Sequence, residues 1–221
     1  MEITYLGHAS FKIKSKSGAV IIIDPFSPEI VGLPFPKDVA DVLIVSHNDP
    51  GHNNISAVTG PVTRLSTFVV DKEGEYEIGG IEIATYKTFH DGSEGQQRGK
   101  NLVNVIRIDG ITLCHLGDLG HELTDTLIEK IGVIDVLMAR VGGEVALDAE
   151  KMAKLIRDIS PSYVIPMHYK EPGHKGDFVN MPGIEVFTEK NKYQMAGDPV
   201  HKIKIDEGSL PDETQILMMN A

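Results

Sequence analysis

The sequence predicts a single α/β domain in which two packed β-sheets carry helices on their outer faces. Strand-like segments dominate the first half of the chain, and helix and strand patterns alternate in the second half. Neither an internal repeat nor a low-complexity linker divides the 221 residues, a length that is ample for one core and short for two. We therefore expect one domain that spans residues 1–221.

Short apolar segments separated by turn residues predict the strands of the first half. Residues 11–14 alternate apolar and lysine side chains, which is typical of a strand buried on one face. The run Val-Ile-Ile-Ile at 20–23 lacks alternation and favours a strand covered on both faces. Asp109-Gly110 between two apolar segments predicts a hairpin. Strands are expected at 3–6, 11–14, 19–23, 42–45, 81–89, 102–108 and 111–116, with a short helix at 52–58.

The second half combines helical periodicity with short apolar runs. Asp148 is a suitable N-cap, and the apolar side chains that follow recur at helical spacing up to Ile159, before Ser160-Pro161. This pattern predicts a helix over 149–159. A further helix is expected at 122–131, and strands are expected at 133–138, 163–166, 200–205 and 215–218.

Charge and composition restrict the classes of partner. The 32 acidic and 21 basic residues give a formal net charge of −11, which repels nucleic-acid backbones and anionic membrane surfaces. We therefore expect a small-molecule substrate, without nucleic acid or membrane as partner. One cysteine excludes an intramolecular disulfide framework, and the N-terminus lacks the pattern of a signal peptide. The expected location is cytoplasmic.

Histidines follow the predicted strands at several points. His47, His90 and His168 each come directly after a strand-like segment, and His115 lies near the end of another, followed by Asp118. Loops at one edge of a sheet often deliver functional side chains. Imidazole and carboxylate ligands suit zinc, manganese or iron. The spacing therefore favours a metal site built from separate segments.

The segment 46–52 is the densest of these, because it holds two histidines and one aspartate directly after a buried strand. A tight turn here would direct His47, Asp49 and His52 toward one point. However, a turn rich in Asn, Asp, Pro and Gly needs no metal to explain it. The segment alone is consistent with either interpretation.

Five segments in order resemble the metallo-β-lactamase-fold superfamily, in the branch that includes L-ascorbate-6-phosphate lactonase. The segment 46–52 is similar to the signature His-x-His-x-Asp-His, and residues 7–11, Gly-His-Ala-Ser-Phe, resemble the opening strand and turn of that branch. The segments 89–91, 115–118 and 166–169 match the later His, Gly-Asp and His segments. Together these segments span residues 7–169, most of the chain.

This resemblance implies an αββα sandwich, with two mixed β-sheets flanked by helices and metal ions at one edge of the sheets. It also implies the ligands of one or two divalent ions of zinc, manganese or iron. By the resemblance, the first metal is held by His47, Asp49 and His90, the second by position 51, His52 and His168, and Asp118 bridges the two.

Two positions depart from the signature. Asp49 replaces the second histidine, and its carboxylate can reach nearly the same place as an imidazole Nδ1, which favours manganese or iron over zinc. Gly51 replaces the signature aspartate and brings no ligand. The second metal would then keep His52, His168 and Asp118, which bind more weakly. A one-metal enzyme, a two-metal enzyme with altered chemistry and a degenerate site all remain open.

The function that the resemblance implies is metal-dependent hydrolysis of a small, anionic lactone, ester or phosphoester. The expected nucleophile is a metal-bound hydroxide, because a bound cation lowers the pKa of its water to about 7. Asp118 is expected to position that water and take its proton, with Asp49 in the same role. Arg98, in a glycine-rich loop after His90, is a candidate for binding an anionic substrate group. Assembly into a homo-oligomer is expected from relatives in that branch.

Other interpretations remain. Gly51 favours a catalytically impaired protein that binds a metal or ligand without turnover. A nuclease is disfavoured by the acidic charge. His8 is interpreted either as a hydrogen-bonded structural residue or as a partner of the metal ligands, and the segment 140–143 as a lesser candidate for the pocket edge. His174 and His201 are interpreted as surface residues.

Overall fold

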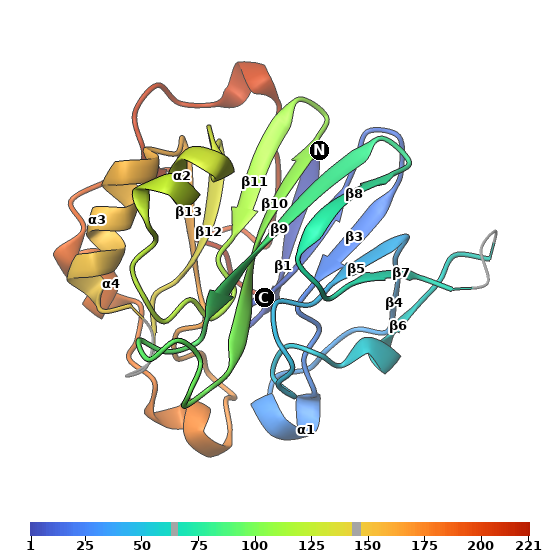
Figure 1. Cartoon of the computed structure of the whole chain (residues 1–221), viewed down its shortest axis with the longest axis horizontal. Helices are drawn as coiled ribbons and strands as arrows, with labels where there is room; N and C mark the ends of the chain where they lie inside the picture. Colours follow the sequence, from blue (N-terminus) through green and yellow to red (C-terminus); the bar gives the residue numbers. More distant parts are fainter. Residues whose placement is uncertain (63–65, 143–146) are drawn as a thin grey trace.

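The computed structural model describes residues 1–62, 66–142 and 147–221, and its strands form two large β-sheets and one small one. The two large sheets pack face to face (Figure 1). The six-stranded sheet has the order β15 (Lys202–Lys204), β1 (Glu2–Gly7), β2 (Ser10–Lys14), β3 (Val20–Ile23), β5 (Val42–Ile44), β7 (Phe68–Val70). The eight-stranded sheet has the order β14 (Gln194–Met195), β16 (Gln215–Ile216), β13 (Tyr163–Met167), β12 (Val136–Arg140), β11 (Ile111–His115), β10 (Lys100–Ile108), β9 (Ile81–Phe89), β8 (Gly74–Ile78). The small sheet pairs β4 (Asp38–Val39) with β6 (Val58–Thr59).

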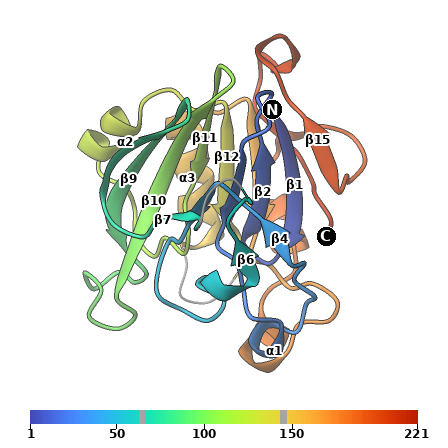
Figure 2. The same ribbon diagram turned by 90° about the vertical axis from the view of Figure 1, so that its right-hand side faces the viewer.

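Helices lie mainly on the outer face of the eight-stranded sheet (Figure 1). They are α2 (Asp125–Ile131), α3 (Ala149–Ile159) and α4 (Glu185–Lys190), while α1 (Pro28–Val31) lies near one end of the six-stranded sheet. Figure 2 shows β4 and β6 in front of the outer face of the six-stranded sheet. No helix in the described ranges is long and apolar enough to cross a membrane.

The main core lies between the two large sheets and is built from apolar side chains of both. In β3, Ile21 and Ile23 enter this core, whereas Ile22 packs on the opposite face with Ala40 and Val58. The lack of alternation in this run is thus explained by burial on both faces, as predicted. A second core lies between the eight-stranded sheet and the helices, where Met152, Leu155 and Ile156 of α3 pack.

Local signals fixed several element ends. Asp109 and Gly110 both have positive φ angles, 55° and 82°, as a two-residue type I′ hairpin requires. The Asp148 side chain accepts a hydrogen bond from the Lys151 N–H at 2.8 Å, which caps α3 as predicted. The helix expected from 122 begins at Asp125, because Thr124 caps it.

The short helix expected at 52–58 is wrong. The structure has a single 3₁₀ turn there, Ile55–Ala57, followed by β6. The preceding residues are held in the loop, since the Asn54 N–H donates to the Pro25 carbonyl at 2.7 Å and its side chain to the Phe26 carbonyl at 3.0 Å. Asparagine also has a weak helix propensity.

Both large sheets end at the same edge of the sandwich, and this places the candidate site. Strands β3 and β5 are parallel, as are β11, β12 and β13. Functional side chains follow the carboxyl ends of strands in each sheet: His8, Asp24 and His47 after β1, β3 and β5, and His90, Asp118 and His168 after β9, β11 and β13.

Candidate metal centre

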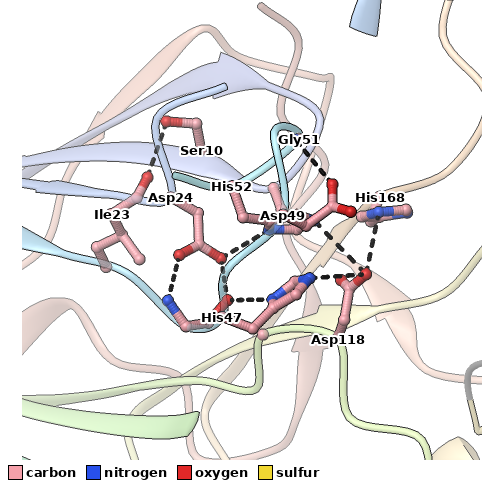
Figure 3. A network of polar contacts seen from close by, with 12 residues as sticks. Ser10, Ile23, Asp24, His47, Asp49, Gly51, His52, Asp118 and His168 are labelled. Atoms are coloured by element: carbon pink, nitrogen blue, oxygen red, sulfur yellow. Dashed lines mark hydrogen bonds and ion pairs between the residues drawn. The ribbon is translucent and has the colours of Figure 1, made fainter. Parts of the chain in front are cut away.

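The carboxylate of Asp118 is the centre of the candidate site. Its Oδ2 lies 3.2 Å from the Nε2 of His90 and 3.4 Å from that of His168. The Nε2 atoms of His52 and His47 lie 3.5 Å and 3.9 Å from the same oxygen (Figure 3). Four histidines from three separate segments therefore point at one buried carboxylate.

Asn101 and Gly117 hold Asp118 in position. The Asp118 N–H donates to Asn101 Oδ1 at 2.8 Å, and the Asn101 amide donates to the Leu116 carbonyl at 2.9 Å. Gly117 has a φ of 56°, and a Cβ there would lie only 2.3 Å from Asn101 Oδ1. Glycine is therefore required at 117 for both its backbone angle and its close approach to Asn101.

His52 is oriented by Asp24. The Asp24 Oδ2 lies 2.9 Å from His52 Nδ1 (Figure 3). The Asp24 carboxylate also accepts from the N–H and hydroxyl of Ser46 at 2.7 Å and 2.6 Å. The contact with Nδ1 leaves His52 Nε2 to face Asp118. Burial alone lowers the pKa of His52, but Asp118 and Asp24 outweigh it and raise that pKa to about 10.

The pKa values of His47 and Asp118 are both lowered, but by different causes. Burial, followed by the neighbouring His52, lowers the pKa of His47 to about 4. Burial raises the pKa of Asp118, but the Arg140 guanidinium, followed by His168, outweighs it and holds that pKa well below its usual range. Asp118 is thus an ionised acceptor surrounded by imidazoles.

Arg140 contacts the site more closely than the sequence indicated. Its Nη1 forms an ion pair with Asp118 Oδ2 and lies 2.9 Å from His90 Nε2, which must accept because a guanidinium only donates. Of the segment 140–143, residue 143 lies outside the described residues. The side chain of Arg140 is buried, so its charge is shielded from water and acts directly on this carboxylate.

Asp49 and Gly51 form the tight turn before His52. The Asp49 Oδ1 accepts from the Gly51 N–H at 2.8 Å, so one carboxylate oxygen stabilises the turn itself (Figure 3). Its side chain is half-buried. Among the described residues, two groups of three place one ligand atom of each member within 4.8 Å of the others, and neither includes Asp49 or His90. These groups are His47, His52 and Asp118, and His8, His52 and His168.

Several buried polar atoms at the site have no hydrogen-bond partner in the described part of the chain. They are both ring nitrogens of His8, Nε2 of His47, Nδ1 of His168 and Oδ1 of Asp118. A buried polar atom without a partner costs about 1–3 kcal/mol. Their convergence in two groups of imidazoles and a carboxylate fits a divalent cation of the zinc, manganese or iron type.

The remaining histidines have distinct surroundings. His115 is buried with both nitrogens engaged, by the Ala9 carbonyl at 2.9 Å and the Gly117 N–H at 3.1 Å. His121 Nε2 accepts from the Phe89 N–H at 3.1 Å. His201 is exposed, as expected, but the surface interpretation of His174 is wrong, because His174 is buried beside His8 and Phe178.

A cavity of ≈ 760 Å³ opens beside His47. Its basic lining residues are Lys72, Lys87, Arg98 and Lys100, and its acidic ones are Asp71 and Glu73. The loop that carries Arg98 is ordered by Asp91, whose buried carboxylate accepts four backbone N–H groups, from Ser93, Gly95, Gln97 and Arg98. The candidate substrate residue Arg98 therefore lies on a defined wall of this cavity.

Some residues that the structure brings to the site were not predicted from the sequence. Asp24 comes directly after β3, but it was not among the site residues predicted from the sequence. Its φ of 46° is a further sign of a functional position. Asn101 follows Lys100 at the start of β10, and nothing in its sequence context indicated its contact with Asp118.

This combination of two packed mixed sheets with a histidine and aspartate centre at one edge defines the metallo-β-lactamase fold. A family model of the beta-lactamase superfamily domain matches residues 2–168, and the chain belongs to this superfamily. The resemblance of the motifs to the metallo-β-lactamase-fold superfamily is therefore confirmed.

Individual relatives agree with this assignment. A UPF0173 metal-dependent hydrolase of Carboxydothermus hydrogenoformans is 28% identical over 195 residues, which cover 76% of this chain and 84% of that protein. The crystal structure of a protein from Thermotoga maritima, described as a Zn-dependent hydrolase of the metallo-beta-lactamase superfamily, is 32% identical with a TM-score of 0.77 and covers 99% of this chain and 97% of its own. A metal-dependent hydrolase structure from Parabacteroides distasonis, at 18% identity and a TM-score of 0.64 over 99% and 93% of the two chains, shares the fold. The expectation of a metal-dependent hydrolase agrees with the names of these relatives.

Proposed function

We propose that this protein hydrolyses a small anionic lactone, carboxylic ester or phosphoester with the help of one or two divalent metal ions. The convergence of four histidine Nε2 atoms on Asp118 Oδ2 carries the proposal. The metal-dependent hydrolases among its relatives support the reaction class. The ligands that we assign are His47, Asp49, His52, His90, Asp118 and His168, with zinc, manganese or iron as the metal.

A bound metal supplies Lewis acidity and a water that ionises near neutral pH. The protein provides the electrostatic frame for it. Asp24 holds His52 in a single orientation through its Nδ1, and Asn101 holds Asp118 through its backbone N–H. These contacts preorganise the donor atoms before substrate arrives.

Asp49 is the better proton acceptor of the two aspartates proposed as catalytic. Asp118 is buried, and Arg140 holds its pKa well below the usual range, so it binds a proton weakly. No ion pair joins Asp49 to a cation within the described residues, and its half-buried carboxylate has one oxygen outside the turn hydrogen bond. Asp118 then positions the reacting groups, while Asp49 removes the proton where its second oxygen is not bound to the metal.

The preference for an anionic substrate comes from the cavity beside His47. Its volume lies within the usual range for small-molecule pockets. Four basic and two acidic side chains line it in a protein whose net charge is −11, so its positive character is local. Arg98 is suited to bind a carboxylate or phosphate with two parallel hydrogen bonds.

A substrate screen tests the function. Protein reconstituted with zinc, manganese or iron would be assayed on matched lactones, carboxylic esters and phosphoesters, each with and without an added anionic group. We expect turnover that needs metal and that is higher for the anionic member of a pair. Saturable binding of these compounds without turnover would instead support the impaired, binding-only protein that Gly51 suggests.

A further inference from the structure

His8 lies against the group that would bind the second metal. Its ring centroid is 4.0 Å from that of His168 and 5.2 Å from that of His52. One ligand atom from each of these three histidines lies within 4.8 Å of the other two, close enough for one cation to bind all three after small side-chain movements. All three side chains are buried.

The His8 ring has no other role in the described contacts. Both of its nitrogens are buried and lack a hydrogen-bond partner among the described residues. The ring is fully buried, and the rings of Phe26 and Phe178 face it edge-on, with centroid distances of 5.9 Å and 4.8 Å. Neither phenyl ring offers a hydrogen bond. A purely structural histidine here would carry two unpaired polar atoms, at a cost of about 1–3 kcal/mol each.

The backbone fixes His8 in this place. Its N–H donates to Glu171 Oε1 at 2.8 Å, and its carbonyl accepts from the Tyr5 hydroxyl at 2.8 Å. Its φ is 57°, a left-handed conformation that residues other than glycine rarely adopt. Such strain is typical of positions that the surrounding structure holds for function.

Gly51, which replaces the signature aspartate, lies next to the His8 ring. Gly51 has no positive φ that would require glycine, so space rather than backbone geometry accounts for it. A Cβ at 51 would lie 3.2 Å from His8 Nε2 and 3.1 Å from Asp49 Oδ1. A side chain at 51 and the His8 ring would therefore compete for the same space beside His52 and His168.

We propose that His8 is a metal ligand and that, with His52 and His168, it completes the second metal position that Gly51 leaves without a ligand. This inference rests on the proposed metal-dependent function and names the donor that it would need. The second position would then have three imidazoles, which is the number of protein ligands in a zinc site that keeps one position open.

The test measures metal binding rather than activity. Metal-free protein would be titrated with Co²⁺, with affinity and ligand set read from its visible absorption and stoichiometry from elemental analysis. The test variant is His8→Asn, because asparagine tolerates a positive φ, and His8→Gly is the second variant for the same reason. Circular dichroism and thermal unfolding of the metal-free variants show that they fold.

Two further variants make the result specific. His174→Asn is the matched control, since His174 is buried with its ring 5.6 Å from that of His8 but belongs to neither ligand group. His8→Asn/Gly51→Asp offers a carboxylate in place of the lost imidazole. Gly51→Asp alone shows whether the added carboxylate helps while His8 is present.

We expect both His8 variants to bind the second equivalent of Co²⁺ about 100-fold more weakly or worse, with altered absorption bands. His174→Asn should bind like the native protein, and Gly51→Asp should regain at least about tenfold only in the His8→Asn background. Native-like binding by both His8 variants would overturn the inference and leave the hydrolase proposal intact, as would an equal loss in His174→Asn. A native protein that binds no Co²⁺ would overturn both proposals.

Discussion

The backbone N–H of His168 donates a hydrogen bond to the carbonyl oxygen of His8 at 2.7 Å, and both residues have positive φ angles, 56° and 57°. The two strained turns, one after a strand of each large sheet, thus hold each other in place. Because strain at one turn is supported by the other, we expect stability at this junction to depend on the residue type at each position.

Replacement of His168 separates backbone strain from ligand loss. His168→Gly should be more stable than His168→Ala by about 1 kcal/mol in the metal-free protein, because only glycine adopts this φ without cost. Urea unfolding of the two variants measures the difference. Equal stabilities would show that the strain at 168 is not stored in the folded state.

Loss of the Asp24 carboxylate should weaken metal binding without removing a ligand. Asp24→Asn leaves His52 Nδ1 without its anionic partner, and we expect metal affinity to fall about 10- to 100-fold. Asp41→Asn is the control, since its Oδ2 accepts from the Val20 N–H at 2.9 Å in the same sheet, away from the site. Competition with a chromophoric chelator gives both affinities, and an equal loss in both variants would contradict the orienting role.

Chelation should lower the melting temperature markedly. A metal present at about 1,000 times its dissociation constant stabilises the folded state by about 4.1 kcal/mol. In a chain of this length that corresponds to a shift of roughly 8–16 °C. Thermal unfolding with and without a chelator measures the shift, and re-addition of zinc or manganese should restore it. An unchanged melting temperature would argue against a tightly bound ion.

Truncation of Arg98 should weaken the binding of anionic substrates and leave the binding of uncharged ones nearly unchanged. Arg98→Ala should raise the KM for an anionic substrate about tenfold or more and leave kcat nearly unchanged, because a charged hydrogen bond contributes about 1.5–3 kcal/mol. The KM for an uncharged analogue should stay within about twofold of the native value. Arg107→Ala, at the far end of β10, is the control for general charge loss. If Arg98→Ala changed the KM of both substrates by a similar factor, a role for Arg98 in binding the anionic group would be contradicted.

Acid should destabilise the metal-free protein partly through His174. Burial lowers the pKa of His174 to about 4, below the value of about 6.5 in the unfolded chain. Its contribution to stability is therefore fully present above pH 6.5 and is lost as pH falls toward 4. Because one imidazole binds at most one proton, the slope stays below the ceiling of about 1.4 kcal/mol per pH unit. Urea unfolding at several pH values should show a shallower slope for His174→Asn, and an identical slope would contradict this account.

The fold was predictable because its signals are local and repeated. The run at 20–23 indicated a strand covered on both faces, and Asp109-Gly110 fixed the hairpin between β10 and β11. The motif order gave the family, and the superfamily match confirms it. Strand β7 went unpredicted because it has only three residues, and β8 because most of its side chains are exposed.

The site was predictable where a histidine or aspartate lies within three residues of the end of a strand. His47, His90, Asp118 and His168 meet as expected, but their distances to Arg140 and Asn101 depend on contacts between distant segments. The environment of His8 likewise depends on residues near 168 and 178, far along the chain. No local pattern encodes such contacts, so the sequence left His8 between two interpretations.

The two sheets of the sandwich each contribute only part of the donor set. Residues up to 52 supply His8, His47 and His52, and residues from 90 onward supply His90, Asp118 and His168. As the chain leaves the ribosome, its first half thus presents at most an incomplete, low-affinity chelate. If the proposed ligands bind a metal, we expect ion capture to follow the docking of the two halves, which would make metal uptake a late step in maturation.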